Sequence, residues 1–137
     1  MRVQQLDHIN FSVQDLDASL DWYTRVFDFV TVERGLSDGI PFAIQRSGEA
    51  LLCMYEHPEL EFVDRHERAR RGLHGVSHFS FRITDREEWE LRATREGVEF
   101  HYGGAVERPH SLAWYLNDPT GYEIEVALWE GDEIRFS

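Results

Sequence analysis

The sequence predicts an α+β fold made of two similar halves, and two observations carry this prediction. The first is a repeated pattern: residues 6–15 align with residues 76–85 without a gap, so that His8 falls on His78, 70 positions later in a chain of 137 residues. The second is that each half reads as a strand, a helix and then three strands. A pattern repeated at about half the chain length indicates an internal duplication.

The order of the elements leaves two sheet types to compare. Strands that alternate with single helices are typical of a parallel, doubly wound sheet. The three-strand runs here are joined by tight turns, however, which favours antiparallel hairpins. We therefore expect two curved mixed sheets, each with a helix on its outer face and its other face open.

In the first half, residues 3–13 form the first expected strand, because Ile9, Phe11 and Val13 alternate with polar residues. Asp15 is placed to cap a helix that runs to about Asp28, with apolar residues at helical spacing. The remaining expected strands are 29–36, 41–46 and 49–55, separated by the turn sequences 37–39 and 47–48.

In the second half the same order returns after a charged connector, 57–74. We expect a strand over 75–83 and a helix over 85–95 with Trp89 and Leu91 on its packed face. Short strands are expected near 98–101, 111–116 and 122–128. The chain is thus read as one domain over 1–137, with module one at about 1–56 and module two at about 75–130.

Composition excludes several classes of function. The net charge of −12 argues against a nucleic-acid partner and against an anionic membrane surface. All fourteen basic residues are arginine, so no lysine is present to form a Schiff base or act as a base. Cys53 is the only cysteine, which excludes an internal disulfide, and no apolar run has the length of a membrane span. We expect a cytoplasmic protein.

The open faces of the two sheets carry the candidate chemistry. His8 and His78 alternate with the apolar residues that face the helices, so both should point to the open side. In the last strand Ile124 and Val126 face the helix, which turns Glu123 and Glu125 to the open side. Two histidines and one carboxylate form a face that holds a divalent metal and leaves positions for a substrate.

Residues 6–16, followed by 19–23, resemble the opening of the vicinal oxygen chelate superfamily. Residues 75–81 resemble the start of its second module, and residues 117–125 its closing turn and ligand strand. That superfamily includes glyoxalases, methylmalonyl-CoA epimerases, fosfomycin and bleomycin resistance proteins and extradiol dioxygenases. The resemblance implies a βαβββ module used twice around an open cleft, and His8, His78 and Glu125 as metal ligands.

The resemblance also implies partners. The metal would be Fe(II) or Mn(II), with Zn(II) or Ni(II) as alternatives. The substrate would be a small molecule with vicinal oxygens. A homodimer is expected because relatives often build the site across a dimer, and the sequence leaves open whether His8 meets His78 of its own chain or of the partner. Tyr115 and Glu123 are the candidates to move or orient a proton, and Asn10 and Tyr115 the candidates to hydrogen-bond to the substrate.

The reaction class stays open. At the fourth ligand position of the isomerases this chain has Cys53, with Tyr55 and Glu56 as neighbours. A three-ligand site favours chemistry like that of extradiol dioxygenases or resistance transferases. The alternatives are a glyoxalase-type isomerase (lactoylglutathione lyase) and a non-catalytic, drug-binding protein of the bleomycin-resistance type.

Other conspicuous residues are expected to be structural or solvated. The charged run 64–71 is interpreted as a solvated connector. Trp114 and Trp129 are expected to line the cleft or a subunit contact. The remaining histidines are expected to be surface or structural residues: His57, His66, His74, His101 and His110.

Overall fold

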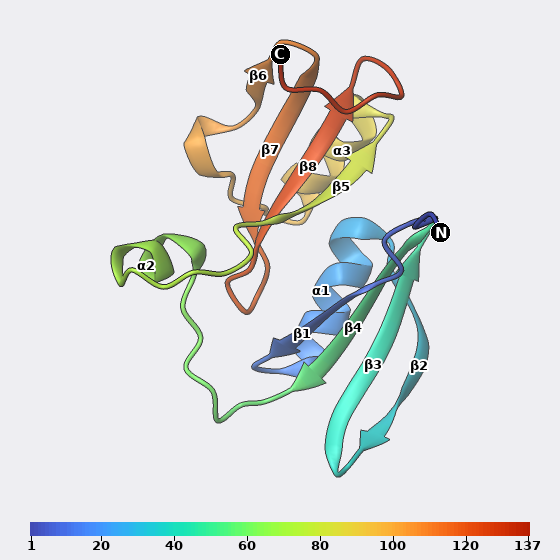
Figure 1. Cartoon of the computed structure of the whole chain (residues 1–137), viewed down its shortest axis with the longest axis vertical. Coiled ribbons are helices and arrows are strands. Elements are labelled where there is room, and N and C mark those ends of the chain that lie inside the picture. Colours follow the sequence, from blue (N-terminus) through green and yellow to red (C-terminus); the bar gives the residue numbers. More distant parts are fainter. The chain divides into compact units, whose positions relative to one another are not determined.

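Each half of the chain forms a four-stranded mixed sheet with a helix on one face (Figure 1). The computed structural model describes residues 1–137 and divides into two compact units, Met1–Phe62 and Val63–Ser137. The expected α+β class, with two open, curved mixed sheets, is confirmed. No helix in the chain is both long enough and apolar enough to cross a membrane.

The N-terminal unit has the strand order β1-β4-β3-β2, in which β1 and β4 are parallel and the other pairs are antiparallel. Its elements are β1 (Ile9–Val13), α1 (Leu16–Phe27), β2 (Val30–Ser37), β3 (Ile40–Ser47) and β4 (Ala50–Glu56). Helix α1 contacts β3 and β4.

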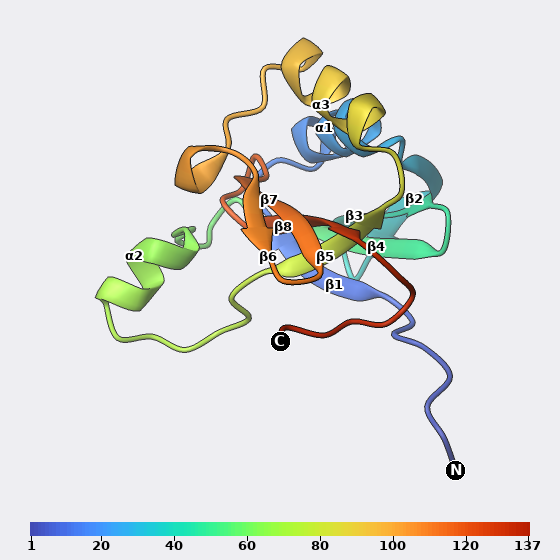
Figure 2. The same ribbon diagram turned by 90° about the horizontal axis from the view of Figure 1, so that it is seen from above.

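The C-terminal unit repeats this topology as β5-β8-β7-β6, with β5 and β8 parallel. Figure 2 shows α3 alongside one face of this sheet. The elements are α2 (Arg65–Arg70), β5 (Phe79–Ile83), α3 (Arg86–Arg95), the short 3-10 helix η1 (His101–Gly103), β6 (Val106–Arg108), β7 (Ser111–Asn117) and β8 (Glu123–Trp129).

The two parallel strand pairs have matching registers. Asn10 pairs with Cys53 across β1 and β4, and Ser80 pairs with Glu125 across β5 and β8. Since Asn10 and Ser80 are equivalent in the repeat, Cys53 occupies in the N-terminal unit the position that Glu125 occupies in the C-terminal unit. The same reasoning makes Leu51 the equivalent of Glu123.

The start of α1 shows why the sequence folds locally as it does. The Asp15 carboxylate accepts a hydrogen bond from the backbone N–H of Ala18 at 2.9 Å, the expected helix cap. The apolar stripe that follows is buried, with Leu16 and Tyr23 almost fully inaccessible. On the opposing sheet Leu52 and Met54 are equally buried, so this face of the sheet forms the core of the unit.

Several expected elements differ from the structure. The first strand begins only at Ile9. In α3 the expected packing of Leu91 is wrong, since its side chain is 65% exposed. The buried side of that helix is formed by Trp89 and Ala93, four residues apart. No strand forms over 98–101. Gly97, with a φ of 66°, follows the end of α3, and the chain then continues into η1 instead of a strand. A short strand that the sequence did not predict, β6, pairs with β7.

Candidate metal and acid site

His78 and Glu125 form a pair on the open face of the C-terminal sheet. His78 immediately precedes β5, and its Nε2 lies 3.2 Å from Oε2 of Glu125 on the neighbouring strand β8. Glu125 is half-buried and His78 is about a third exposed. The bond to His78 lowers the pKa of Glu125, so the carboxylate is ionised at neutral pH despite its burial.

Tyr115 on β7 completes this pair from the next strand. It lies directly opposite Glu125 in the antiparallel register, and its hydroxyl donates a hydrogen bond to Glu125 Oε1 at 3.0 Å. Its ring also meets the His78 imidazole edge-on. Burial raises the pKa of the Tyr115 phenol and the Glu125 charge raises it further, so the hydroxyl keeps its proton as a donor.

Glu123 is a fully buried carboxylate at the start of β8. Arg65 forms a very short ion pair with its Oε1, while His101 Nδ1 lies 3.0 Å from Oε2 and the Tyr102 hydroxyl donates to Oε2 at 3.1 Å. Burial raises the pKa of Glu123, but the hydrogen bonds from Arg65, His101 and Tyr102 outweigh that effect and the net shift is downward. The carboxylate is therefore buried as an anion.

The partners of Glu123 come from two short helical elements. Asp64 caps α2 by accepting a hydrogen bond from the backbone N–H of Glu67 at 2.8 Å, which fixes the first turn carrying Arg65 and His66. In η1, Tyr102 adopts a left-handed backbone conformation with φ of 57°. This turn presents both His101 and Tyr102 to Glu123.

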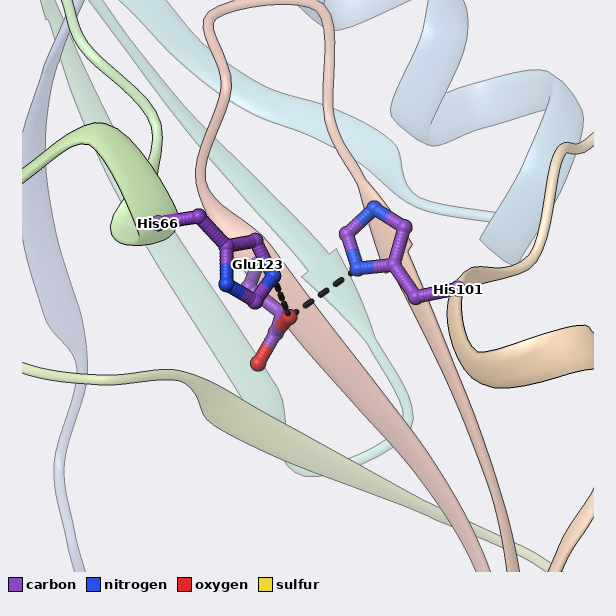
Figure 3. Close-up of side chains that lie close together, drawn as sticks. All are labelled: His66, His101 and Glu123. Carbon is purple, nitrogen blue, oxygen red and sulfur yellow. Dashed lines mark hydrogen bonds and ion pairs between the residues drawn. The ribbon is translucent and has the colours of Figure 1, made fainter. Parts of the chain in front are cut away.

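Figure 3 shows His66 and His101 on either side of the Glu123 carboxylate. His66 Nε2 lies 3.6 Å from Glu123 Oε2. One donor atom from each of His66, His101 and Glu123 lies within 4.8 Å of the other two, a spacing that can hold a metal ion. His66 is largely exposed and both histidines contact a buried carboxylate, so the expectation that they are surface or structural residues stands untested as to metal binding. Within the run 64–71, which was expected to be a solvated connector, Arg65 instead pairs with the buried Glu123.

The remaining predicted site residues belong to the N-terminal unit. His8 lies just before β1, is largely exposed, and its Nδ1 lies 2.7 Å from Oδ2 of Asp7. Asn10 is exposed on β1, next to Cys53 of β4. The convergence of His8 and Asn10 with His78 and Glu125 remains a prediction.

The three neighbours at the fourth ligand position differ in what they contact. Glu56 Oε2 accepts a hydrogen bond from the backbone N–H of Leu16 at 2.8 Å, so this carboxylate caps α1. Tyr55 stacks on Phe42, with ring centroids 5.6 Å apart. Burial raises the pKa of the Cys53 thiol, so it is a neutral, half-buried group.

Trp114 does not line the open face. It is almost fully buried on the opposite side of β7, where its ring approaches Trp89 of α3 edge-on, with centroids 6.5 Å apart. Strand alternation explains the difference, since Trp114 precedes Tyr115 and must point the other way.

The His78 and Glu125 side chains fit a shared metal ion. With bonds of about 2.0–2.2 Å, two neighbouring ligand atoms are separated by roughly 3–3.5 Å, and the observed separation of Nε2 and Oε2 is 3.2 Å. Nδ1 of His78 is buried without a hydrogen bond, and Glu123 Oε1 lies 3.7 Å from it. A carboxylate behind a metal-binding histidine is the usual way in which such a ring is oriented.

Two βαβββ units, the second carrying a histidine, a carboxylate and a tyrosine on its open face, define a duplicated α+β fold with a candidate metal site. The chain matches the Glyoxalase/Bleomycin resistance protein/Dioxygenase superfamily over residues 5–126 and belongs to it. The sequence-based resemblance to this superfamily is thereby confirmed.

Solved structures share the fold. A glyoxylase/bleomycin resistance protein/dioxygenase domain from Frankia sp. EAN1pec has a TM-score of 0.78 and 24% identity, covering 93% of this chain and 99% of its own. A mutant of the fosfomycin resistance protein FosX from Listeria monocytogenes, complexed with Mn(II) and 1S,2S-dihydroxypropylphosphonic acid, has a TM-score of 0.70 and 18% identity over 96% and 95% of the two chains. Lactoylglutathione lyase from Agrobacterium tumefaciens has a TM-score of 0.67 and 23% identity, over 93% and 96%.

Proposed function

We propose that this protein is a divalent-metal-dependent enzyme that binds a small substrate through two neighbouring oxygen atoms. His8, His78 and Glu125 would hold the ion. The observation that carries the proposal is the 3.2 Å separation of His78 Nε2 and Glu125 Oε2 on one open sheet face. Superfamily membership supports it, as does the Mn(II) complex of the FosX mutant, whose ligand carries two adjacent hydroxyl groups.

The chain's own residues would divide the work around the ion. When bound, the metal supplies Lewis-acid stabilisation of negative charge on the substrate oxygens. Tyr115 holds Glu125 through its hydroxyl and keeps a proton next to the site. Glu123 lies behind His78, where it would set the orientation of the ring. Asn10 would offer its amide to the substrate from β1.

The residue at the fourth ligand position bears on the reaction class that we propose. A glyoxalase-type isomerase needs a second carboxylate or amide there, and this chain has the neutral Cys53 instead, with Glu56 committed to capping α1. The three-ligand set therefore favours a dioxygenase of the extradiol type or a transferase of the resistance type. We favour Fe(II) or Mn(II), because two imidazoles and one carboxylate suit these ions.

A second candidate function rests on the stacked pair Phe42 and Tyr55. Because Phe42 pairs with Tyr55 across β3 and β4, both rings lie on the open face of the N-terminal sheet. Such an aromatic surface suits a planar ligand, as in a drug-sequestering protein of the bleomycin-resistance type. The metal content separates the two functions, since sequestration requires no ion.

The test begins with protein purified without chelators, its metal content measured by mass spectrometry, and its subunit mass by light scattering. We expect bound metal, a homodimer, and the loss of one equivalent of metal in His78→Ala and in Glu125→Gln but not in the control His110→Ala. Oxygen uptake with catechols, modification of fosfomycin in the presence of a thiol, and isomerisation of a glutathione hemithioacetal then distinguish the reactions. Wild-type affinity for Mn(II) and Fe(II) in both His78→Ala and Glu125→Gln would overturn the proposal.

A further inference from the structure

We propose that His66, His101 and Glu123 form a second metal site, contained within the C-terminal unit. Its ligands are distinct from His8, His78 and Glu125, although Oε1 of Glu123 also lies 3.7 Å from Nδ1 of His78. Three separate elements supply its ligands: α2, η1 and the first residue of β8. All three ligands lie in the same compact unit, so their mutual geometry is defined by that unit alone.

The donor atoms converge on a single carboxylate oxygen. Oε2 of Glu123 lies 3.0 Å from His101 Nδ1 and 3.6 Å from His66 Nε2. Tetrahedral zinc with bonds of about 2.0–2.2 Å has ligand atoms roughly 3.3–3.5 Å apart. The two observed separations lie on either side of that value, and the three donors fit within 4.8 Å. Small side-chain shifts would close the set around an ion.

The second oxygen of Glu123 is engaged separately. Arg65 pairs with Oε1, which leaves Oε2 as the atom directed at the two imidazoles. A metal-binding carboxylate is normally held by a hydrogen bond to its other oxygen, and Arg65 is in the position to provide it. The Tyr102 hydroxyl, within 3.1 Å of Oε2 and 3.4 Å of His66 Nε2, lies beside the same space.

The exposure of the three side chains is also consistent with a metal site. Glu123 has no exposed side-chain surface, whereas His66 is 45% exposed and His101 about a quarter exposed. The carboxylate therefore forms the closed floor of the cluster and His66 its solvent side, which gives an ion a route of entry. A divalent cation bound at Oε2 would add to the compensation of the buried charge that Arg65 provides at Oε1.

The ligand set selects the class of metal. Two imidazole nitrogens and one carboxylate oxygen are typical ligands of Zn(II) and of neighbouring transition ions. Mg(II) and Ca(II) prefer complete oxygen shells, which this cluster does not offer. The three protein ligands leave a further position for water or for the Tyr102 hydroxyl.

The experiment compares zinc stoichiometry in chelator-stripped full-length protein, measured by competition with a chromophoric chelator. We expect two equivalents of zinc in the wild type and one in the double variant His66→Ala/His101→Ala. The matched control is His57→Ala/His110→Ala, whose histidines also lie beside carboxylates, and it should bind two equivalents. The variant His8→Ala/Glu125→Gln should retain the equivalent bound by His66 and His101. Equal stoichiometry in the wild type and in His66→Ala/His101→Ala would overturn the second site and leave the proposed function untouched.

A second measurement uses the wild type alone, so that it does not depend on the folding of a variant. Long-range ¹H–¹⁵N spectra of the histidine rings report which nitrogen binds zinc. We expect coordination through Nδ1 of His101 and Nε2 of His66, the atoms that approach Glu123. Unchanged nitrogen shifts of both rings at saturating zinc would contradict the proposal.

Discussion

His78 and Glu125 approach each other on the open face of the C-terminal sheet with Nε2 and Oε2 3.2 Å apart, although they lie 47 positions apart in the chain. The parallel pairing of β5 with β8 produces this approach, because it pairs Phe79 with Ile124 and thus brings the residues flanking them together. The energetic and functional consequences of this relationship can be measured.

Removal of bound metal should destabilise the protein. An ion that binds only the folded state at about 100 times its dissociation constant adds about 2.7 kcal/mol. With an unfolding entropy of about 2.1 cal/mol/K per residue, this corresponds to a rise in Tm of roughly 9 °C for a chain of 137 residues. Calorimetry before and after chelation, with Mn(II) added back, checks this. In Glu125→Gln the response to Mn(II) should be much smaller, and an unchanged response would argue against Glu125 as a ligand.

Loss of the Tyr115 hydroxyl should weaken metal binding with little effect on folding. Tyr115→Phe removes the hydrogen bond to Glu125 Oε1 and keeps the ring that packs against His78. We expect about a tenfold rise in the Kd for Mn(II), the low end for loss of a ligand-orienting bond, and a cost to unfolding of about 1 kcal/mol. Tyr55→Phe serves as the control, and titration calorimetry gives the comparison.

Glu56 should prove structural rather than metal-binding. Its carboxylate accepts the hydrogen bond of the first backbone N–H of α1, so Glu56→Ala should cost about 1 kcal/mol of stability, as for loss of a helix cap. Metal stoichiometry should not change, either in this variant or in Cys53→Ser. Loss of an equivalent in Glu56→Ala would instead place the carboxylate in a ligand set.

The stability of the metal-free protein should depend on the charge of Glu123. The pKa of Glu123 is lowered on folding, so its ionised form contributes stability above the pKa of the unfolded chain, about 4.3, and this contribution is lost as pH falls through the folded value. Wild type and Glu123→Gln should therefore differ most near neutral pH and converge in acid. Urea unfolding in chelator from pH 7 to pH 3 measures the difference, and parallel curves would contradict the assignment.

Period-two alternation was the most informative pattern in the sequence. It correctly placed Glu123 and Glu125 on the face opposite Ile124 and Val126, and Asp15 correctly predicted the start of α1. These features depend on neighbours in sequence, because strand geometry and helix capping are local.

The partners of Glu123 could not be predicted in the same way. Arg65 and His101 are separated from Glu123 by 58 and 22 residues and lie in segments without periodicity. One signal did exist, since a carboxylate on a strand face that becomes buried requires a cation or donors. The reversal at Tyr102 had a weaker signal in Gly103, the last residue of η1, and Gly104, which follows it; both have positive φ, which glycine adopts readily.

The equal registers of the two parallel strand pairs have an evolutionary consequence. Cys53 and Leu51 stand where Glu125 and Glu123 stand in the other copy, so after duplication only one copy kept, or acquired, acidic residues at these positions. The N-terminal copy can then contribute to an ion only through His8. The rest of its open surface is free to diverge toward new ligands without loss of the acidic positions in the other copy.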